Sequence, residues 1–205
     1  MIAPVKAIVF DCDGVMFDSQ QANLTFYNQI FTYFGVPAVT LEQTERVRVC
    51  HTASSPQVFE FLLGAERVDE AIAYASSINY CQFIPQLSIE PGLLEVLDAL
   101  VEHYPLGIAT NRGSSMVNIL EYFKLNHYFT HVLTHLDVER PKPNPDILLE
   151  AAKRFGQSTA EVLFVGDSEY DKQAACLSGC QFISYQWDGG VRIDNHRGLL
   201  KLLNL

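Results

Sequence analysis

The sequence of 205 residues predicts an α/β protein: a doubly wound, Rossmann-like parallel sheet with an inserted α-helical cap domain. Short apolar runs without polar alternation end abruptly in turns, and helical patterns lie between them. Strands that lack alternation are covered on both faces, as in a parallel sheet flanked by helices. Alternation of such strands with helices is typical of a doubly wound core.

Apolar runs predict the strands, and apolar stripes at helical spacing predict the helices between them. The strands are AIVF before Asp11, LGIA before Thr110, HVLT from His131, VLFV before Gly166 and FISY after Gln181. Pro91 opens one predicted helix, with a stripe of Leu93, Leu94, Val96, Leu97 and Leu100. Pro145 precedes another, with a stripe of Ile147, Leu148, Ala151, Ala152 and Phe155. The tail RGLLKLLNL predicts a closing amphipathic helix.

A long helical stretch, residues 19–84, separates the first strand from the second and predicts the cap. We expect hinges at residues 14–19 and 84–92, where glycine, proline and capping residues cluster. The core then comprises residues 1–16 and 89–205, and the cap residues 17–88. Asp18 and Ser19 are interpreted as the N-cap of the first cap helix.

Composition excludes several classes of protein. The formal net charge is -10 and the basic residues are scattered, which argues against a nucleic-acid partner. The five cysteines are odd in number and lack CxxC spacing, so we expect neither a disulfide framework nor a zinc site. The sequence shows no signal-peptide pattern and no apolar stretch of 18 residues. We therefore expect a cytoplasmic protein without a membrane partner.

Two carboxylates follow the first strand in the sequence VFDCDGVMFDS. Asp11 and Asp13 lie two residues apart, where an open α/β sheet presents its ligand crevice. Such a pair suits one hard divalent cation, or divides the roles of nucleophile and general acid/base. Gly14 lets the chain turn there. The alternative is an Asp-Gly turn with solvated side chains.

Polar residues also follow three later strands. Thr110, in ATNRGSS, suits a phosphoryl group, although such clusters also cap helices. Lys142 lies between prolines in RPKPNPD, which suits a fixed cation, with an ordinary surface lysine as the alternative. Asp167 and Asp171, in VGDSEYD, add two acids at i, i+4 spacing, with capping of a helix start as the alternative reading.

Together, the segments DxDG, Thr-Asn, Lys-Pro and GDxxxD resemble the haloacid dehalogenase-like hydrolase superfamily, in its phosphoglycolate phosphatase and β-phosphoglucomutase-like branch. The resemblance covers nearly the whole chain. It implies that Asp11 is the nucleophile and a Mg²⁺ ligand, and that Asp13 is the acid/base, with its backbone carbonyl on the metal. The phosphate-binding residues that it implies are Thr110, Asn111, Arg112 and Lys142, and the metal residues are Asp11, Asp13, Asp167 and Asp171. Thr110 and Lys142 are also counted among the catalytic residues.

The activity expected from this resemblance is hydrolysis of a small phosphorylated metabolite through a phosphoaspartate, with Mg²⁺ as cofactor. Magnesium and Lys142 would screen the repulsion between Asp11 and the phosphate. Asp13 argues against a dehalogenase. The absence of lysine between Lys6 and Lys124 excludes the Schiff base of phosphonate-cleaving relatives. A phosphomutase stays open, and a non-catalytic phosphoaspartate signalling module would leave Asp13 and the cap without a role.

Substrate choice is expected to depend on the cap and the crevice rim. The candidate polar residues are Arg46, Arg48, His51, Ser54, Ser55 and Arg112. We interpret the first two as solvating a helix face. The aromatic residues interpreted as cap core are Tyr27, Phe31, Phe34, Phe59 and Phe61. Cys12 and Arg112 depart from the usual family pattern.

Overall fold

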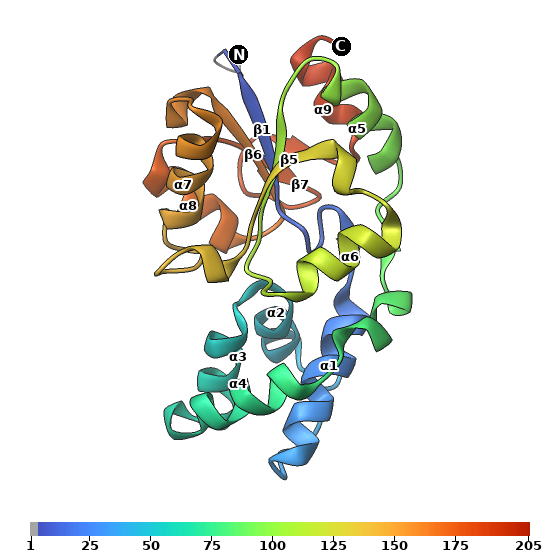
Figure 1. Ribbon diagram of the computed structural model, residues 1–205, viewed down its shortest axis with the longest axis vertical. Coiled ribbons are helices and arrows are strands. Elements are labelled where there is room, and N and C mark those ends of the chain that lie inside the picture. The colour runs from blue at the N-terminus through green and yellow to red at the C-terminus, as the bar shows by residue number, and fades with distance from the viewer. Residues whose placement is uncertain (1–3) are drawn as a thin grey trace.

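The computed structural model describes residues 4–205 as an α/β core joined to a helical cap (Figure 1). The core sheet has six parallel strands in the order β5-β4-β1-β6-β7-β8. The strands are β1 (Ala7–Phe10), β4 (Leu106–Ala109), β5 (Phe129–Leu133), β6 (Val162–Gly166), β7 (Gln181–Tyr185) and β8 (Arg192–Ile193). Every residue of β1, β4 and β6 is buried, because helices cover both faces. The predicted fold class is confirmed.

Two strands of the core sheet differ from the prediction. Strand β5 begins at Phe129 rather than His131 and ends at Leu133, because Phe129 already pairs with Leu106 of β4. Strand β8 was not predicted. It has only two residues, one of them exposed, so it leaves no apolar run in the sequence.

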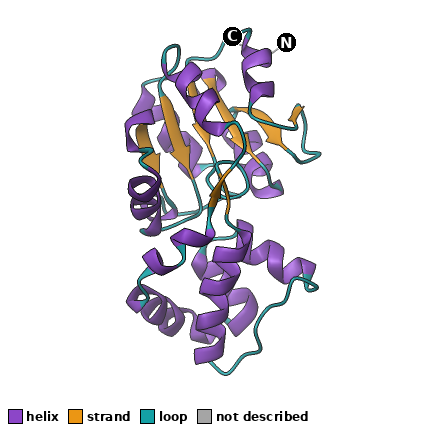
Figure 2. Cartoon of the chain, turned by 90° about the vertical axis from the view of Figure 1, so that its right-hand side faces the viewer, coloured by secondary structure: helices purple, strands orange, loops and turns teal. Residues whose placement is uncertain are grey.

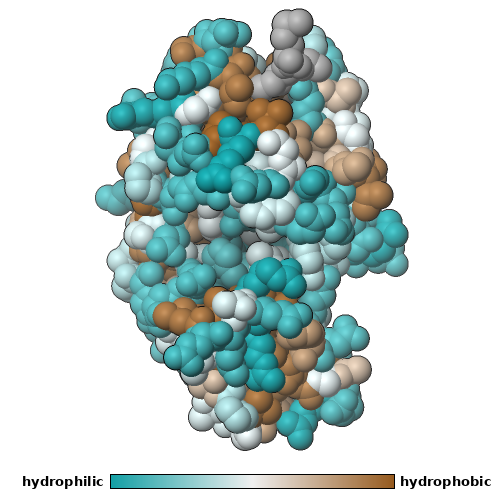
Figure 3. Space-filling model, turned by 180° about the vertical axis from the view of Figure 1, so that it is seen from behind, coloured by the Kyte–Doolittle hydropathy of each residue, from teal (hydrophilic) through white to brown (hydrophobic). Residues whose placement is uncertain are grey.

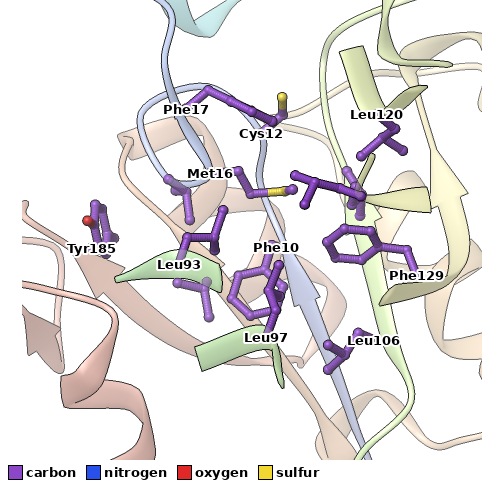
Figure 4. Close-up of a cluster of buried hydrophobic side chains, with 14 of the residues drawn as sticks. Phe10, Cys12, Met16, Phe17, Leu93, Leu97, Leu106, Leu120, Phe129 and Tyr185 are labelled. Atoms are coloured by element: carbon purple, nitrogen blue, oxygen red, sulfur yellow. The ribbon is translucent and has the colours of Figure 1, made fainter. Parts of the chain in front are cut away.

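Five core helices cover the two faces of the sheet. They are α5 (Leu93–Val101), α6 (Ser115–Phe123) and α9 (Arg197–Leu203) on one face, and α7 (Asp146–Phe155) and α8 (Glu169–Ser178) on the other. Ile8 and Phe10 of β1 pack into the hydrophobic cluster beneath α5, α6 and α9, which Figure 4 shows. Ala7 and Val9 point to the other face and pack into the cluster beneath α7 and α8. The predicted closing helix is therefore confirmed as α9. Short 3-10 turns lie at Asn126–Tyr128, His135–Asp137 and Thr159–Glu161.

The predicted helical stripes are largely confirmed. Helix α7 follows Pro145 as expected, and four of its five stripe residues are buried. Helix α5, however, begins at Leu93, after Gly92 in a left-handed conformation, and not at Pro91. Leu94 is 44% exposed, so its assignment to the buried stripe was wrong. Its neighbours Leu93 and Val96 occupy the face toward the sheet.

The cap has its own hydrophobic core. It consists of α1 (Gln20–Tyr33), α2 (Thr44–Thr52), α3 (Ser55–Leu63) and α4 (Val68–Ser77), followed by 3-10 turns at Tyr80–Gln82 and Ile84–Gln86, with another at Ala65–Arg67. Tyr27, Phe31 and Phe59 are buried in that core, and Phe34 packs against it half-buried. Phe61 is 52% exposed, so the prediction that it is a core residue was wrong.

A two-stranded antiparallel ribbon joins the cap to the core. It pairs β2 (Phe17–Asp18) with β3 (Ser88–Ile89), so the chain enters and leaves the cap side by side. Figure 2 shows the cap as a separate helical layer beyond the sheet. The expected boundaries, after residue 16 and before residue 89, fall at this ribbon and stay a prediction.

Ser19 does not cap α1 with its side chain, which corrects the N-cap interpretation. It occupies the residue before the helix, but its hydroxyl donates instead to Asp13. Asp18 Oδ1 accepts only a long hydrogen bond, 3.4 Å, from the N–H of Gln20. The hydroxyl of Ser19 is therefore hydrogen-bonded to Asp13, and it does not cap helix α1.

Two further expectations concern membrane spans and disulfide bonds, neither of which the sequence predicts. Among residues 4–205, none of the helices has the length and apolar character that a membrane span requires. All five cysteines are free thiols. The face of the molecule in Figure 3 is mostly hydrophilic, with hydrophobic side chains in separate patches.

Candidate active site

The residues predicted from the sequence come together at the carboxyl ends of the central strands. Asp11 and Asp13 follow β1, Thr110 to Arg112 follow β4, and Asp167 follows β6, with Asp171 in the first turn of α8. Lys142 reaches the same place from the loop between β5 and α7. The crevice forms because parallel strands end at one edge of the sheet.

Lys142 is a buried cation held between two acids. Its Nζ lies 2.9 Å from Oδ1 of Asp11 and 2.6 Å from Oδ1 of Asp171, and it donates to the carbonyl of Ala109 at 3.1 Å. Burial by itself would lower the pKa of Lys142, but Asp11 and Asp171 raise it above its usual value, so the ammonium stays charged. The alternative of a surface lysine is wrong, since Lys142 is 1% exposed.

Three carboxylates form a compact cluster beside this lysine. Asp11, Asp167 and Asp171 each offer an oxygen, and these oxygens lie within 4.8 Å of one another. Burial, together with the charges of Asp171 and Asp13, raises the pKa of Asp11 to about 7 against the attraction of Lys142. Burial and the neighbouring acids also raise the pKa of Asp167. A site with more acids than cations, built from oxygen donors, fits a hard divalent ion such as Mg²⁺.

Two glycines allow these acids to approach one another. Gly14 has a φ of +74°, and a Cβ placed on it would lie 2.0 Å from Oδ2 of Asp167. A Cβ on Gly166 would lie 2.4 Å from the Cβ of Asp171. The glycine of the DxDG segment is therefore required both for the left-handed turn and for space beside Asp167.

Asp13 lies in a separate hydrogen-bond network. Its Oδ1 accepts from Nη2 of Arg112 at 2.5 Å, from Nδ2 of Asn23 at 3.0 Å, and from the hydroxyl of Ser19. Burial by itself would raise the pKa of Asp13, but Arg112, His51 and the hydrogen bonds hold it below its usual value. Asp13 is thus a carboxylate with a cationic partner, not a solvated turn residue.

Arg112 links the core to the cap. Its Nη2 also donates to Oδ1 of Asn23 at 2.9 Å, and its Nη1 donates to the hydroxyl of Tyr80 at 2.8 Å. Asn23 and Tyr80 are not among the predicted site residues. A signal for Asn23 exists, since it lies one helical turn after Ser19 and therefore faces the same way. We find no sequence signal for Tyr80.

Thr110 and Asn111 order the loops around the crevice. The hydroxyl of Thr110 accepts from the N–H of Arg112 at 3.1 Å. Asn111 accepts from the N–H of Lys142 at 3.0 Å and donates to the carbonyl of Lys142 at 3.0 Å. It also donates to the carbonyl of Thr52, in the cap, at 3.1 Å. Asn111 therefore fixes the loop that carries Lys142.

A cavity of about 450 Å³ lies between the core and the cap. Asp11, Asp13 and Thr110 are part of its wall on the core side. Tyr27 and Phe59, predicted as cap core, are buried there and also line the cavity. The hydrophobic core of the cap and the wall of the cavity therefore share these two residues.

The rim candidates divide into three groups. His51, Ser55 and Arg112 line the cavity, with Nε2 of His51 lying 4.0 Å from Oδ2 of Asp167. Arg46 and Arg48 are exposed on α2 and are absent from its wall, which confirms that they solvate a helix face. Ser54 caps α3 in a capping box with Gln57.

Comparisons with known proteins agree with this arrangement. The sequence model described as "haloacid dehalogenase-like hydrolase" matches residues 8–185. The chain is 30% identical to a phosphoglycolate phosphatase of Aliivibrio fischeri over 95% of this chain and 91% of that protein. It is 28% identical to the pyrophosphatase PpaX of Bacillus velezensis over 89% and 84%. A crystal structure of a subfamily IA hydrolase from Geobacter sulfurreducens superposes with a TM-score of 0.84 at 38% identity, covering 97% and 99% of the two chains.

Proposed function

This chain belongs to the haloacid dehalogenase-like hydrolase family, and from that membership we propose that it is a Mg²⁺-dependent phosphatase acting on a small phosphate monoester through a phosphoaspartate at Asp11. The observation that carries the proposal is the contact of Asp11 with Lys142, at 2.9 Å, inside an acid cluster of which Asp11 lines the cavity between core and cap. The name of the Aliivibrio fischeri relative supports phosphatase chemistry on a small ester. We propose the cytoplasm as its location.

Asp11 is the nucleophile in this proposal. Lys142 Nζ and the N–H of Cys12, at 2.7 Å, both contact Oδ1 of Asp11, so we assign the other oxygen, Oδ2, to attack on phosphorus. Asp11, Asp167, Asp171 and the Asp13 carbonyl would hold Mg²⁺, which when bound would supply charge neutralisation. Lys142 lowers the repulsion between Asp11 and the phosphate, and Thr110, Asn111 and Arg112 are the further phosphate-binding residues.

Asp13 is the general acid and the general base in this proposal. Protonating the alkoxide that leaves requires its acid form, whereas accepting a proton from the water that hydrolyses the phosphoaspartate requires the carboxylate. The contact with Arg112 stabilises the carboxylate, which is the form needed for the second half of the reaction. The two roles alternate within one turnover.

The experiment measures inorganic phosphate released from a panel of metabolite phosphates and an aryl phosphate, with Mg²⁺ or EDTA. We expect turnover that needs Mg²⁺ and that falls at least about 1,000-fold in Asp11→Asn, because the covalent path is lost. Acid-quenched wild type should carry one phosphoryl group by mass spectrometry, and Asp11→Asn none. Undiminished turnover by Asp11→Asn would disprove the proposal. A phosphoenzyme that passes its phosphate to a second ester instead of water would indicate a mutase.

A further inference from the structure

We propose that the alcohol released from the substrate is uncharged and mainly apolar, of the size of a benzyl or short alkyl alcohol, and is not a hydroxy acid such as glycolate. This inference rests on the proposed function and names its substrate class. It concerns the part of the cavity beyond the acid cluster, where the leaving group lies while Asp11 faces the phosphorus.

Most of the residues that line the cap side of the cavity are apolar or aromatic, and its polar side chains include Asn23, His51, Thr52 and Ser76. Its wall includes Phe26, Tyr27, Phe59, Ile72, Ala75 and Ile78. The hydroxyl of Ser55 also lies in the wall, but it is hydrogen-bonded to the hydroxyl of Tyr27 at 3.1 Å. Apolar walls with a few polar groups favour an apolar ligand of matching shape.

The cap supplies no cation to this space. Its basic residues are Arg46, Arg48 and Arg67, and all three are exposed and absent from the cavity wall. A carboxylate on the leaving group would therefore find no positively charged partner on the cap side.

The core side offers no cation beyond those already assigned to the phosphoryl group. Arg112 is the only lysine or arginine in the wall among residues 4–205, and its terminal nitrogens donate to Asp13, Asn23 and Tyr80. Its Nε is buried and has no hydrogen-bond partner among residues 4–205. His51, which reaches the cavity from the cap helix α2, already faces the carboxylate of Asp167 at 4.0 Å.

Charge balance then excludes an acidic leaving group. Asp11 and Asp13 both line the cavity, and Lys142 is occupied by Asp11 and Asp171. A second anion on the substrate would lose its water and meet two carboxylates and aromatic rings, which disfavours binding. A volume of about 450 Å³ accommodates a phosphoryl group together with a small ring.

The test compares monoesters of primary alcohols with the Mg²⁺-loaded enzyme: benzyl phosphate and pentyl phosphate against 2-phosphoglycolate. We expect kcat/KM to be at least about tenfold higher for the two apolar esters, equivalent to about 1.4 kcal/mol. A cation placed in the wall by Ile72→Lys should raise kcat/KM for 2-phosphoglycolate about tenfold and lower it for benzyl phosphate. Ile72→Met, of similar length but neutral, should leave the order of preference unchanged.

A kcat/KM for 2-phosphoglycolate that equals or exceeds that for benzyl phosphate would overturn the inference. Binding separates this result from a failure of the proposed function. Thermal shifts of Asp11→Asn with benzylphosphonate and with phosphonoacetate report preference without turnover. A larger shift with benzylphosphonate supports the inference even if no ester is hydrolysed, and a larger shift with phosphonoacetate contradicts it.

Discussion

Arg112 and Asp13 form a buried ion pair, with 2.5 Å between Nη2 and Oδ1, across a sequence separation of 99 residues. The same guanidinium contacts Asn23 and Tyr80 in the cap. The proposed acid/base is therefore connected directly to the part of the protein that covers the substrate. A change at Arg112 should alter both the protonation of Asp13 and the closure of the cap.

The first prediction concerns Arg112→Met. Removing the cation raises the pKa of Asp13, because burial then acts without the opposing charge. The limb of the pH–rate profile that requires ionised Asp13 should move to higher pH, and kcat/KM at pH 7 should fall about 10- to 100-fold. Arg112→Lys keeps the charge and should move the limb less. An unchanged profile in Arg112→Met would refute a link between the two residues.

The second prediction concerns stability. Lys142→Met leaves Asp11 and Asp171 buried without their cation, and should lower the free energy of unfolding by about 3–5 kcal/mol in urea titrations. Adding Asp171→Asn should restore part of that loss. Lys153→Met removes an ion pair from a side chain that is 78% exposed, and should change stability by less than about 1 kcal/mol. Equal effects of the two single variants would contradict the buried-pair argument.

Metal removal gives the third prediction. Mg²⁺ at about 100 times its Kd should stabilise the protein by about 2.7 kcal/mol and raise the Tm by about 5–10 °C relative to EDTA. Asp167→Asn relieves the repulsion among the clustered acids, so it should raise the Tm in EDTA while abolishing the response to Mg²⁺. Asp194→Asn, at a side chain that is 74% exposed, should respond like wild type. A full Mg²⁺ response in Asp167→Asn would exclude Asp167 as a ligand.

The fourth prediction uses two glycines with similar backbone conformation. Gly14→Ala adds left-handed strain and a clash with Asp167, whereas Gly156→Ala, at a φ of +66°, adds the strain with nothing within 4 Å. Gly156→Ala should lose about 1 kcal/mol of stability, and Gly14→Ala should lose more because of the clash. Only Gly14→Ala should also weaken Mg²⁺ binding, by about 10- to 100-fold in calorimetry. Similar Mg²⁺ affinity in both variants would show that space beside Asp167 is not needed.

The fifth prediction concerns acid stability. His196 is fully buried, with Nε2 2.8 Å from the carbonyl of Val15, and burial lowers its pKa from 6.5 to about 4. Between these values the unfolded chain binds a proton that the folded protein excludes, so stability falls as the pH drops from 6.5 to 4, by up to about 3 kcal/mol. His196→Gln should flatten this slope in urea titrations, and His103→Gln, which is exposed, should not.

The fold and the acid cluster could be predicted because their signals are local. The apolar strands and the acids that follow them adjoin in sequence, and parallel topology brings the strand ends together. The role of Arg112 could not be predicted this way. Its contacts with Asp13, Asn23 and Tyr80 depend on how the cap docks on the core. The hydrophobic periodicity of a single helix or strand carries no information about that docking. The exposure of Phe61 has the same cause, since the partners of α3 set which side is covered.

The ribbon of β2 and β3 has a consequence for how such enzymes diversify. The N–H of Glu90 donates to the carbonyl of Met16 at 3.0 Å, so the two points where the chain crosses into the cap are hydrogen-bonded neighbours. The length and sequence of the segment between these two points can change without shifting the register of the sheet. We therefore propose residues 17–88 as an exchangeable unit: a graft that keeps Ser19 and Asn23, the cap partners of Asp13, should change which alcohol is accepted and retain the phosphoryl chemistry.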